Sequence, residues 1–353
     1  MADAAHELAP FARIPHLDET VRAAARRHVD SLTKPLGALG RLEPLAVHVC
    51  AIQGTLRPEI KAPLAIVFAA DHGVADRGVS AYPRAVTAQM VKNFLAGGAA
   101  ISVLARLQGM DLWVVDAGVD EDCGTHPRLV NAKIRRGTRD LAAESAMTAD
   151  ECHAALLAGK RVLGQVAATD SNTVVLGEMG IGNTASSALL MHRLTGLSLT
   201  ECVGRGTGLD DAGLERKRTT LAAASRRVTK SEPLELLAEF GGYEIAMLTG
   251  ALLQAAARRM LIIVDGFTVT VAAALAARLD RRVLDYCVFG HCSAEHAHRA
   301  LLKHLEVQPL LDLGMRLGEG TGAAVALATV RAALALFTDM ATFESAGVSN
   351  KSG

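Results

Sequence analysis

A glutamate flanked by glycines stands near the end of the chain. Residues 314–323 read Gly-Met-Arg-Leu-Gly-Glu-Gly-Thr-Gly-Ala, with Glu319 at the centre, and an apolar stretch follows at 324–327. Because glycine lets the backbone and a flat ligand come close together, the pattern is typical of a carboxylate placed for chemistry. An acid at the start of a helix, where it interacts favourably with the helix dipole, gives the same pattern. The motif alone favours neither interpretation.

A second glycine-rich run, at 177–184, reads Gly-Glu-Met-Gly-Ile-Gly-Asn-Thr and leads into a helical stretch. A helix that begins after such a turn offers free backbone amides and a positive dipole end, which suit a phosphate group. We therefore expect a phosphate to be bound by the last residues of this run, namely Gly180, Gly182, Asn183 and Thr184.

The same run fits a dinucleotide-binding fingerprint, Gly180-x-Gly182-x-x-Ala185. That fingerprint requires an acidic residue at the end of the following strand. Here the apolar pair 202–203 is followed by Gly-Arg-Gly-Thr-Gly at 204–208 instead. Dinucleotide binding is therefore disfavoured.

A third candidate is Asp265, which with Gly266 follows the apolar run 261–264. This segment is similar to the loop by which type I phosphoribosyltransferases hold a pyrophosphate-activated ribose. Those loops carry two adjacent acids for a Mg²⁺-bound substrate, whereas Gly266 occupies the second position here, so a metal-bound pyrophosphate is not favoured. A ribose ligand and a plain aspartate in a strand-end turn remain about equally favoured for Asp265.

A cluster of histidines lies at 291–298, which reads His-Cys-Ser-Ala-Glu-His-Ala-His. A catalytic zinc site needs three protein ligands, and the spacing here supplies no pair at helix spacing with a recognisable third ligand, so zinc is disfavoured. The preferred interpretation places Ser293 near a phosphate, with the histidines on the following helix. The six cysteines include no Cys-x-x-Cys pair, which indicates reduced, buried thiols.

The composition excludes several classes of protein. Lys plus Arg and Asp plus Glu both number 37, so the net charge favours neither nucleic acid nor a membrane surface as a partner. The N-terminus has no basic start or apolar stretch, and the apolar run 245–257 is too short to span a membrane. We expect a soluble, cytoplasmic protein that binds a small molecule in a local pocket.

Short, continuous apolar runs alternate with longer helical stretches, which predicts an α/β fold with a Rossmann-like, mainly parallel sheet flanked by helices. One helix, at 151–168, is introduced by the capping-box pattern Thr148-x-x-Glu151. Small and polar residues follow each run, which predicts one pocket at the carboxyl edge of the sheet. The predicted strands are Leu64–Ala69, Leu112–Val115, Thr173–Leu176, Leu261–Val264 and Val283–Val288.

The two ends of the chain lack this strand pattern. Ser31–Ile52 and Ala323–Phe337 are predicted to be helical, and the tail 339–353 is expected to fray. We therefore expect a large α/β substrate-binding domain at about 60–310 and a small helical domain built from 1–59 and 311–353.

Taken together, the motifs resemble those of the nicotinate-nucleotide:dimethylbenzimidazole phosphoribosyltransferase family, whose members make the lower-ligand nucleotide of cobalamin. The resemblance covers nearly the whole chain in order, although the first twenty residues match nothing. It is carried by Thr-Lys-Pro-Leu-Gly-Ala-Leu-Gly-Arg at 33–41, Ala-Asp-His-Gly at 70–73, Gly-Val-Ser-Ala-Tyr-Pro at 78–83, the runs at 177–184, 204–208 and 291–296, Asp265-Gly266, and Gly-Glu-Gly-Thr-Gly at 318–322.

The resemblance implies transfer of phosphoribose from nicotinate mononucleotide to 5,6-dimethylbenzimidazole, with inversion at the anomeric carbon. It implies that Glu319 is the general base, with a pKa raised by Leu317 and the nearby apolar helix, and that Glu178 stabilises the oxocarbenium-like transition state. It further implies a homodimer with the pocket near the interface, and no metal or cofactor. The remaining expected contacts are Ser80 and Gln89 with the aromatic base, Lys217, Asp265, Gly266 and Ser293 with the phosphoribose, and Arg316 with the nicotinate carboxylate.

Two other functions remain open from the sequence. A dehydrogenase would bind a nicotinamide dinucleotide saturably and transfer hydride. A nucleotide sensor would bind nicotinate mononucleotide but release no nicotinate.

Overall fold

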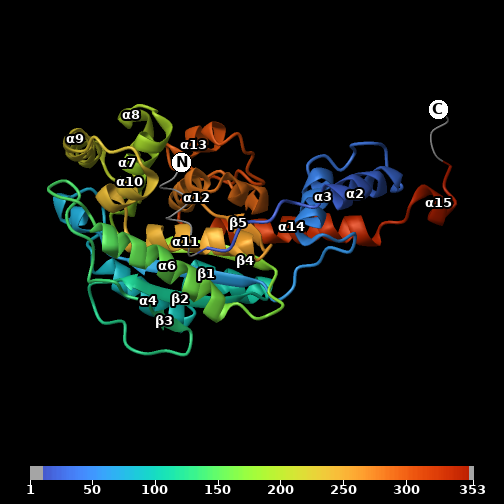
Figure 1. Ribbon diagram of the computed structural model, residues 1–353, viewed down its shortest axis with the longest axis horizontal. Coiled ribbons are helices and arrows are strands. Elements are labelled where there is room, and N and C mark those ends of the chain that lie inside the picture. Colours follow the sequence, from blue (N-terminus) through green and yellow to red (C-terminus); the bar gives the residue numbers. More distant parts are fainter. Residues whose placement is uncertain (1–10, 350–353) are drawn as a thin grey trace.

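The computed structural model describes residues 11–349 and contains one six-stranded parallel sheet (Figure 1). The sequence explains this arrangement, because its strands are almost continuously apolar and buried on both faces, as parallel strands in α/β folds are. In chain order the strands are β1 (Leu64–Ala70), β2 (Asp111–Gly118), β3 (Leu129–Asn131), β4 (Thr173–Met179), β5 (Leu261–Val264) and β6 (Cys287–Phe289).

The strand order is β3-β2-β1-β4-β5-β6, and every pairing is parallel. The chain therefore builds outward from β1 to one edge, returns to the centre at β4, and builds outward to the other edge. The loops that leave β1 and β4 diverge at this point, and open α/β sheets bind their ligands in the crevice so formed. The predicted fold class is confirmed.

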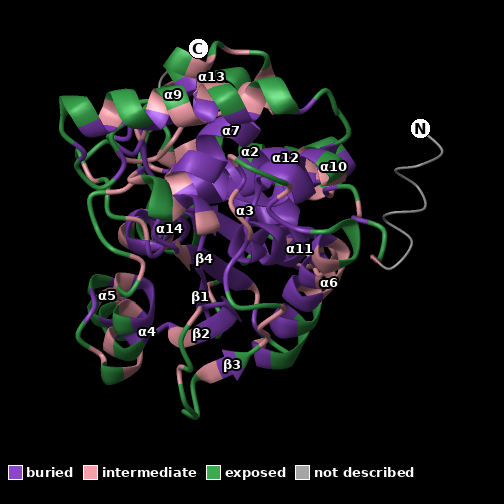
Figure 2. Cartoon of the chain, turned by 90° about the vertical axis from the view of Figure 1, so that its left-hand side faces the viewer, coloured by how far each residue is buried: buried purple, intermediate pink, exposed green. Residues whose placement is uncertain are grey.

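Helices cover the sheet on both sides. Figure 2 shows the strands between α4, α5 and α14 on one side and α6 and α11 on the other. The helices are α2 (Glu19–Ser31), α3 (Leu42–Gln53), α4 (Val86–Ala96), α5 (Ala100–Gln108), α6 (Ala149–Val166), α7 (Asn183–Thr195), α8 (Leu199–Cys202), α9 (Asp211–Arg227), α10 (Pro233–Phe240), α11 (Tyr243–Ala257), α12 (Phe267–Leu279), α13 (His298–His304), α14 (Thr321–Asp339) and α15 (Phe343–Ala346), with the 3-10 helices η1 (Gly73–Arg77) and η2 (Arg281–Tyr286).

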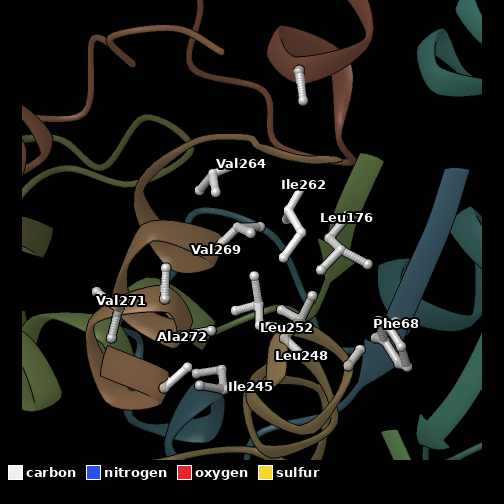
Figure 3. Close-up of a cluster of buried hydrophobic side chains, with 14 of the residues drawn as sticks. Phe68, Leu176, Ile245, Leu248, Leu252, Ile262, Val264, Val269, Val271 and Ala272 are labelled. Carbon is white, nitrogen blue, oxygen red and sulfur yellow. The ribbon is translucent and has the colours of Figure 1, made fainter. Parts of the chain in front are cut away.

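The hydrophobic core is centred on α11, which contacts β1, β2, β4 and β5 as well as α6 and α12. Figure 3 shows how its side chains Ile245, Leu248 and Leu252 lie close to those of the strands and of α12. All three are fully buried. Burying one such side chain contributes about 1.5–3 kcal/mol to the free energy of folding. This packing therefore stabilises the sheet whose strand ends carry the loops of the site.

The predicted strands are confirmed, with one correction. Val283–Val288 was expected to be extended, but η2 occupies Arg281–Tyr286 and β6 begins only at Cys287. Asp280 caps η2 by accepting a hydrogen bond from the Arg282 amide, which stabilises the turn. The short edge strand β3 was not predicted. The helix introduced by Thr148 is confirmed, together with its complete capping box.

The helical predictions for the chain ends hold only in part. Ala323–Phe337 lies within α14, but Ser31–Ile52 is not one helix, because Ser31 ends α2 and the next helix, α3, begins only at Leu42. Pro35 and two glycines interrupt the interval, and Gly37 and Gly40 adopt positive φ angles of 75° and 55°. In the predicted fraying tail, α15 is helical, and residues 350–353 lie outside the described residues.

Helix α2 and the residues that follow it lie beside the end of α14. His28 Nε2 is 2.9 Å from the carbonyl oxygen of Phe337, and the Thr33 amide donates to the carbonyl of Ala341. Helix α14 contacts α3 as well as β4 and β5, so it runs from the centre of the sheet to the terminal helices. Their division into a separate small domain remains a prediction.

Two helical stretches, Val86–Gln108 and Thr321–Asp339, are long and apolar enough to cross a membrane by length and composition. The first consists of α4 and α5 and is broken at Gly97, where φ is 82°. The second is α14, which packs against β4, β5 and α3. The first stretch is therefore two helices rather than one continuous span, and the second is a helix of the protein core.

The crossing of α6 and α11 yields a prediction about stability. A Cβ at Gly159 would collide with the backbone of Met247, whereas Gly164 on the same helix has open space around it. Gly159→Ala should lower the free energy of unfolding by about 1–3 kcal/mol through overpacking. Gly164→Ala should raise it by up to about 1 kcal/mol, because alanine is the better helix former. Urea unfolding of both variants measures this, and destabilisation by both would show that the close crossing is not the cause.

Candidate active site

One pocket collects loops from the carboxyl edge of the sheet. It is bounded by the end of β4 with the start of α7, by the segment after β5, by the segment after β6, and by the loop that precedes α14. The sequence-predicted residues that line it are Glu178, Gly180, Asn183, Thr184, Gly266, Ser293, Arg316 and Leu317. Segments more than a hundred residues apart are thus brought together, as the strand-end pattern predicted.

Two helix N-termini face this pocket without a side-chain cap. Helix α7 follows Gly182, whose φ is 99°, and α12 follows Gly266. Uncapped first turns leave backbone amides free and present the positive end of the helix dipole. These two ends are suited to bind a phosphate.

Lys217 adds a buried positive charge beside them. Its side chain is fully buried, and Nζ donates to Thr184 Oγ1 at 2.9 Å and to the Gly204 carbonyl at 3.1 Å. Burial lowers the pKa of Lys217 to about 8, while the charge of Glu295 acts in the opposite direction. The ammonium group therefore remains predominantly charged at neutral pH.

Ser293 is held by the segment that follows β6. Its amide donates to His298 Nδ1 at 2.8 Å, and its hydroxyl oxygen accepts from the Glu295 amide at 3.2 Å. Glu295 also lines the pocket and is almost fully buried. Glu295 was not predicted from the sequence as a site residue, although its position between Ser293 and the two following histidines could have indicated that it lines the pocket.

Asp265 lies behind the pocket wall and is fully buried. Oδ2 accepts from the Gly320 amide at 3.1 Å and Oδ1 accepts from the Ala323 amide at 2.9 Å. Both carboxylate oxygens are therefore engaged at the N-terminus of α14. Its expected contact with a ribose remains a prediction, whereas its contact with the glycine loop is observed.

The loop held by Asp265 carries Glu319 in a strained conformation. Glu319 has a φ of 65°, between Gly318 at 87° and Gly320 at 91°. The left-handed region costs a residue with a side chain about 1–2 kcal/mol, and such strain gathers at functional sites. The peptide after Glu319 crosses directly over Gly177 of β4, where a Cβ would collide with it. A structural acid at a helix start needs none of these constraints.

The Glu319 carboxyl is 5% exposed, and burial raises its pKa above the ordinary value. The charge of Asp265 acts in the same direction, whereas a long hydrogen bond of 3.4 Å from the Ile101 amide lowers it. This direction agrees with the expected upward shift of the pKa. Leu317, which was expected to contribute to this burial, is itself 56% exposed, so its contribution stays a prediction.

Glu178, at the end of β4, faces the same loop from the pocket side. Burial raises its pKa to about 8, and the charges of Asp265, Glu244 and Glu319 add to the shift. The Asn183 side-chain amide donates a hydrogen bond to it and acts in the opposite direction. At neutral pH, Glu178 therefore holds a proton for most of the time while the pocket is empty.

The two residues expected to meet the aromatic base, Ser80 and Gln89, are not among those that line this pocket. Ser80 is partly buried and accepts a hydrogen bond from the Tyr82 amide, and Gln89 is exposed on α4. Thr87 connects this helix to the pocket, because its hydroxyl oxygen accepts from the Ile181 amide at 3.2 Å. Arg316 is also exposed and donates to the Gly206 carbonyl at 3.4 Å.

Comparison with known proteins identifies the family. The DBI_PRT model, described as phosphoribosyltransferase, matches residues 14–348. The chain is 56% identical to the nicotinate-nucleotide–dimethylbenzimidazole phosphoribosyltransferase of Cupriavidus taiwanensis, across 97% of this chain and 99% of the relative. It is 47% identical to the enzyme of that name from a Roseiflexus species, across 97% of each chain.

The chain belongs to this family of phosphoribosyltransferases.

Structural comparison agrees with this assignment. The crystal structure of CobT from Thermus thermophilus superposes with a TM-score of 0.91 at 44% identity, covering 94% of this chain and all of the other. The family match begins at residue 14, so the expectation that the first twenty residues match nothing is wrong for residues 14–20.

This phosphoribosyltransferase also contains a buried hydrogen-bonded group that sequence reasoning missed. His72 Nε2 donates to Glu244 Oε1 at 2.5 Å, and Ser186 on α7 donates to His72 Nδ1 at 3.0 Å. His72 and Glu244 are fully buried. These hydrogen bonds connect the loop after β1 with the first turns of α7 and α11. Glu244, an acid at the start of the otherwise apolar helix α11, was the feature of the sequence that could have indicated this group.

The histidine and cysteine segment after β6 has no metal-binding arrangement. Within residues 11–349, no group of three or more His, Cys, Asp or Glu side chains is placed to hold a metal ion. His298 instead makes hydrogen bonds through both ring nitrogens, to the Ser293 amide and to Thr270.

The crossing at Gly177 yields a prediction for this transferase. Gly177→Ala should displace the Glu319 peptide. If Glu319 has the catalytic role predicted from the sequence, kcat should fall at least about tenfold, because small misplacements of a catalytic group are costly. The exposed Gly164→Ala change on α6 serves as the control and should leave kcat unchanged. Initial rates measure both, and full activity of Gly177→Ala would show that this contact does not place Glu319.

Proposed function

We propose that this chain transfers phosphoribose from nicotinate mononucleotide to 5,6-dimethylbenzimidazole, giving α-ribazole 5′-phosphate and nicotinate for the lower ligand of cobalamin. The observation that carries the proposal is the buried Glu319 carboxyl on a strained loop, whose preceding residues Leu317 and Gly318 line the pocket together with two uncapped helix N-termini. This reaction requires a base and a phosphate site within reach of the same ribose. The names of the relatives support the same substrates.

The reaction is a single displacement at C1′. One nitrogen of the benzimidazole forms the new bond to C1′, and the bond from C1′ to the pyridine nitrogen breaks. Its electron pair returns to that nitrogen and neutralises the pyridinium, so the leaving group needs no acid. Direct attack inverts the anomeric centre from β to α.

Glu319 is the proposed general base for this step. It accepts the proton from the second benzimidazole nitrogen while the first attacks. A general base works best when its pKa lies near the operating pH, and burial raises the pKa of Glu319 in that direction. The Ile101 amide, at 3.4 Å, makes too long a contact to compete strongly for the carboxylate.

Glu178 is proposed to stabilise the positive charge that develops on the ribose. A nearby cation favours the ionised form of a carboxyl group, so the pyridinium of the bound donor should lower the pKa of Glu178. Proton loss would then accompany donor binding. The resulting carboxylate faces the oxocarbenium-like transition state.

The other ends of the substrates have proposed partners of matching charge. The phosphate would be bound at the start of α7, by Gly180, Gly182, Asn183 and Thr184, and by Lys217, Gly266 and Ser293. Asp265 stands behind this site, and Arg316 at the rim would meet the nicotinate carboxylate. The benzimidazole ring would lie near Ser80, Gln89 and Leu317, whose half-exposed side chain is available to cover a flat apolar ligand.

We also infer that the enzyme is a cytoplasmic homodimer whose pockets lie near the interface. Helix α5 exposes Leu107 at 75% and Val103 at 49%, close in sequence to the Ile101 contact of Glu319. Apolar surface of this kind is commonly covered by a partner. Sedimentation measures the oligomeric state directly.

One assay separates this proposal from a dehydrogenase and from a nucleotide sensor. The purified protein is incubated with nicotinate mononucleotide and dimethylbenzimidazole, and the products are identified by mass. We expect the riboside phosphate and an equal amount of nicotinate. Binding of the mononucleotide without release of nicotinate would favour a sensor and overturn the proposal.

The role of Glu319 can be tested against the simpler role of a helix-start acid. Glu319→Gln should reduce kcat about 10²–10⁴-fold, with a small change in KM, because the base is lost and its shape is kept. Glu235 is an exposed acid in the first turn of α10, so Glu235→Gln removes the same kind of dipole interaction. It should leave kcat unchanged. Nearly full turnover by folded Glu319→Gln would overturn the assignment.

The shifted pKa values predict how activity depends on pH. Glu178 and Glu319 must both be ionised, so kcat/KM should rise with pH. The rise should be complete only above the Glu178 pKa of about 8. Lys217 loses its charge above its pKa of about 8, so kcat/KM should then fall. The expected profile is a narrow bell near pH 8, and Glu178→Gln should remove the acid limb near 8. A maximum below about pH 6 would contradict this account.

A further inference from the structure

His291, directly after β6, has no hydrogen-bond partner for its imidazole ring. The side chain is 2% exposed, and neither Nδ1 nor Nε2 forms a hydrogen bond with any of the described residues. A buried polar group without a partner is costly, so a histidine in this position needs a reason other than packing.

The neighbouring His298 shows the ordinary alternative. Because the Ser293 amide donates to its Nδ1, the ring proton lies on Nε2 and is donated to Thr270 Oγ1 at 2.9 Å. Burial, together with the charge of His291, lowers the pKa of His298 to about 3, so this ring is neutral. His298 is a structural histidine, and His291 is not accounted for in the same way.

The group that His291 does face is Asp265. Its Nε2 lies 3.6 Å from Asp265 Oδ1, which is within ion-pair range but longer than a hydrogen bond. The ring is fixed from the other side, because a Cβ at Gly322 would collide with it. Its backbone is fixed by the bridge between His291 and Leu311. The imidazole is therefore held between the carboxylate and the first turn of α14.

The charge of Asp265 affects two other carboxyl groups of the site. Glu178, from β4, and Glu319, from the loop before α14, both lie within electrostatic range of Asp265. Within the described part of the chain, His291 is the one side chain that forms an ion-pair contact with Asp265. The ionised form of Asp265 is the better acceptor for the Gly320 and Ala323 amides, which donate to its two oxygens.

We propose that His291 is a positioning residue for Glu319, acting through its ion-pair contact with the Asp265 carboxylate, which in turn holds the glycine loop in place. The inference rests on the proposed function, since it assumes that Glu319 is the base. The positive charge of His291 lowers the pKa of Asp265 and so opposes the upward effect of burial. A neutral Asp265 would in turn stop raising the pKa values of Glu178 and Glu319.

The test uses two substitutions of the full-length enzyme. His291→Leu removes both ring nitrogens and the charge, whereas His291→Gln retains an amide donor near the position of Nε2. We expect His291→Leu to lower kcat about tenfold or more, with less than about a threefold change in the KM for nicotinate mononucleotide. The acid limb of kcat/KM should move to lower pH. His291→Gln should show a smaller loss of kcat and the same direction of shift.

A double-mutant cycle with Glu319→Gln distinguishes positioning from stability. In the Glu319→Gln background, His291→Leu should reduce the residual rate by less than about twofold, because the base it positions is absent. His28→Leu is the matched control, since His28 contacts Phe337 at the far end of α14. It should change neither kcat nor the pH profile. If His291→Leu does not fold, the same cycle with His291→Gln decides the question.

The outcomes separate this inference from the proposed function. If the wild-type enzyme forms no riboside phosphate, the proposed function fails. If wild type is active and Glu319→Gln is not, but His291→Leu keeps the wild-type rate and pH profile, the positioning role alone is overturned. An equal loss of rate in both backgrounds would likewise overturn it, because it would show a structural role.

Discussion

The carboxylate of Asp265 accepts backbone amides from Gly320 and Ala323, and the geometry of the site depends on this contact. It joins the end of β5 to the start of α14 and fixes the loop in which Glu319 adopts a left-handed conformation. The bare backbone of Gly177 on β4 provides the surface over which this loop passes. An anion in a cradle of amides at a helix start is a stable arrangement, so the strain at Glu319 is offset locally.

Buried negative charge is the second organising feature. Glu178, Glu244, Asp265 and Glu319 influence one another electrostatically, and the pKa values of Glu178, Asp265 and Glu319 are raised by burial. Such a group of acids is costly without counter-charge. His72 contacts Glu244 and His291 faces Asp265, which leaves Glu178 and Glu319 free for a cationic substrate. The proposed donor, a pyridinium nucleotide, brings the charge that this pocket lacks.

Much of the site was predictable because its signals are local in sequence. Glycines around Glu319 and in the run 177–184 indicated a placed acid and a phosphate-binding turn, and the strand-end pattern predicted that they share one edge of the sheet. The role of Asp265 was not predictable, because its partners lie 55 and 58 residues away along the chain. Leu317 was expected to bury Glu319, but exposure is decided by tertiary packing. The helix at 281–286 was missed because its apolar residues also suit a strand.

The central claim is that the loop held by Asp265 presents Glu319 to the nitrogen of an aromatic nucleophile. A crystal structure of the enzyme with dimethylbenzimidazole bound tests this most directly. The account predicts one ring nitrogen within hydrogen-bond distance of the Glu319 carboxylate, with the other directed toward the phosphate-binding helix ends. A ring that binds elsewhere, or whose nitrogens contact only solvent or another side chain, would contradict it.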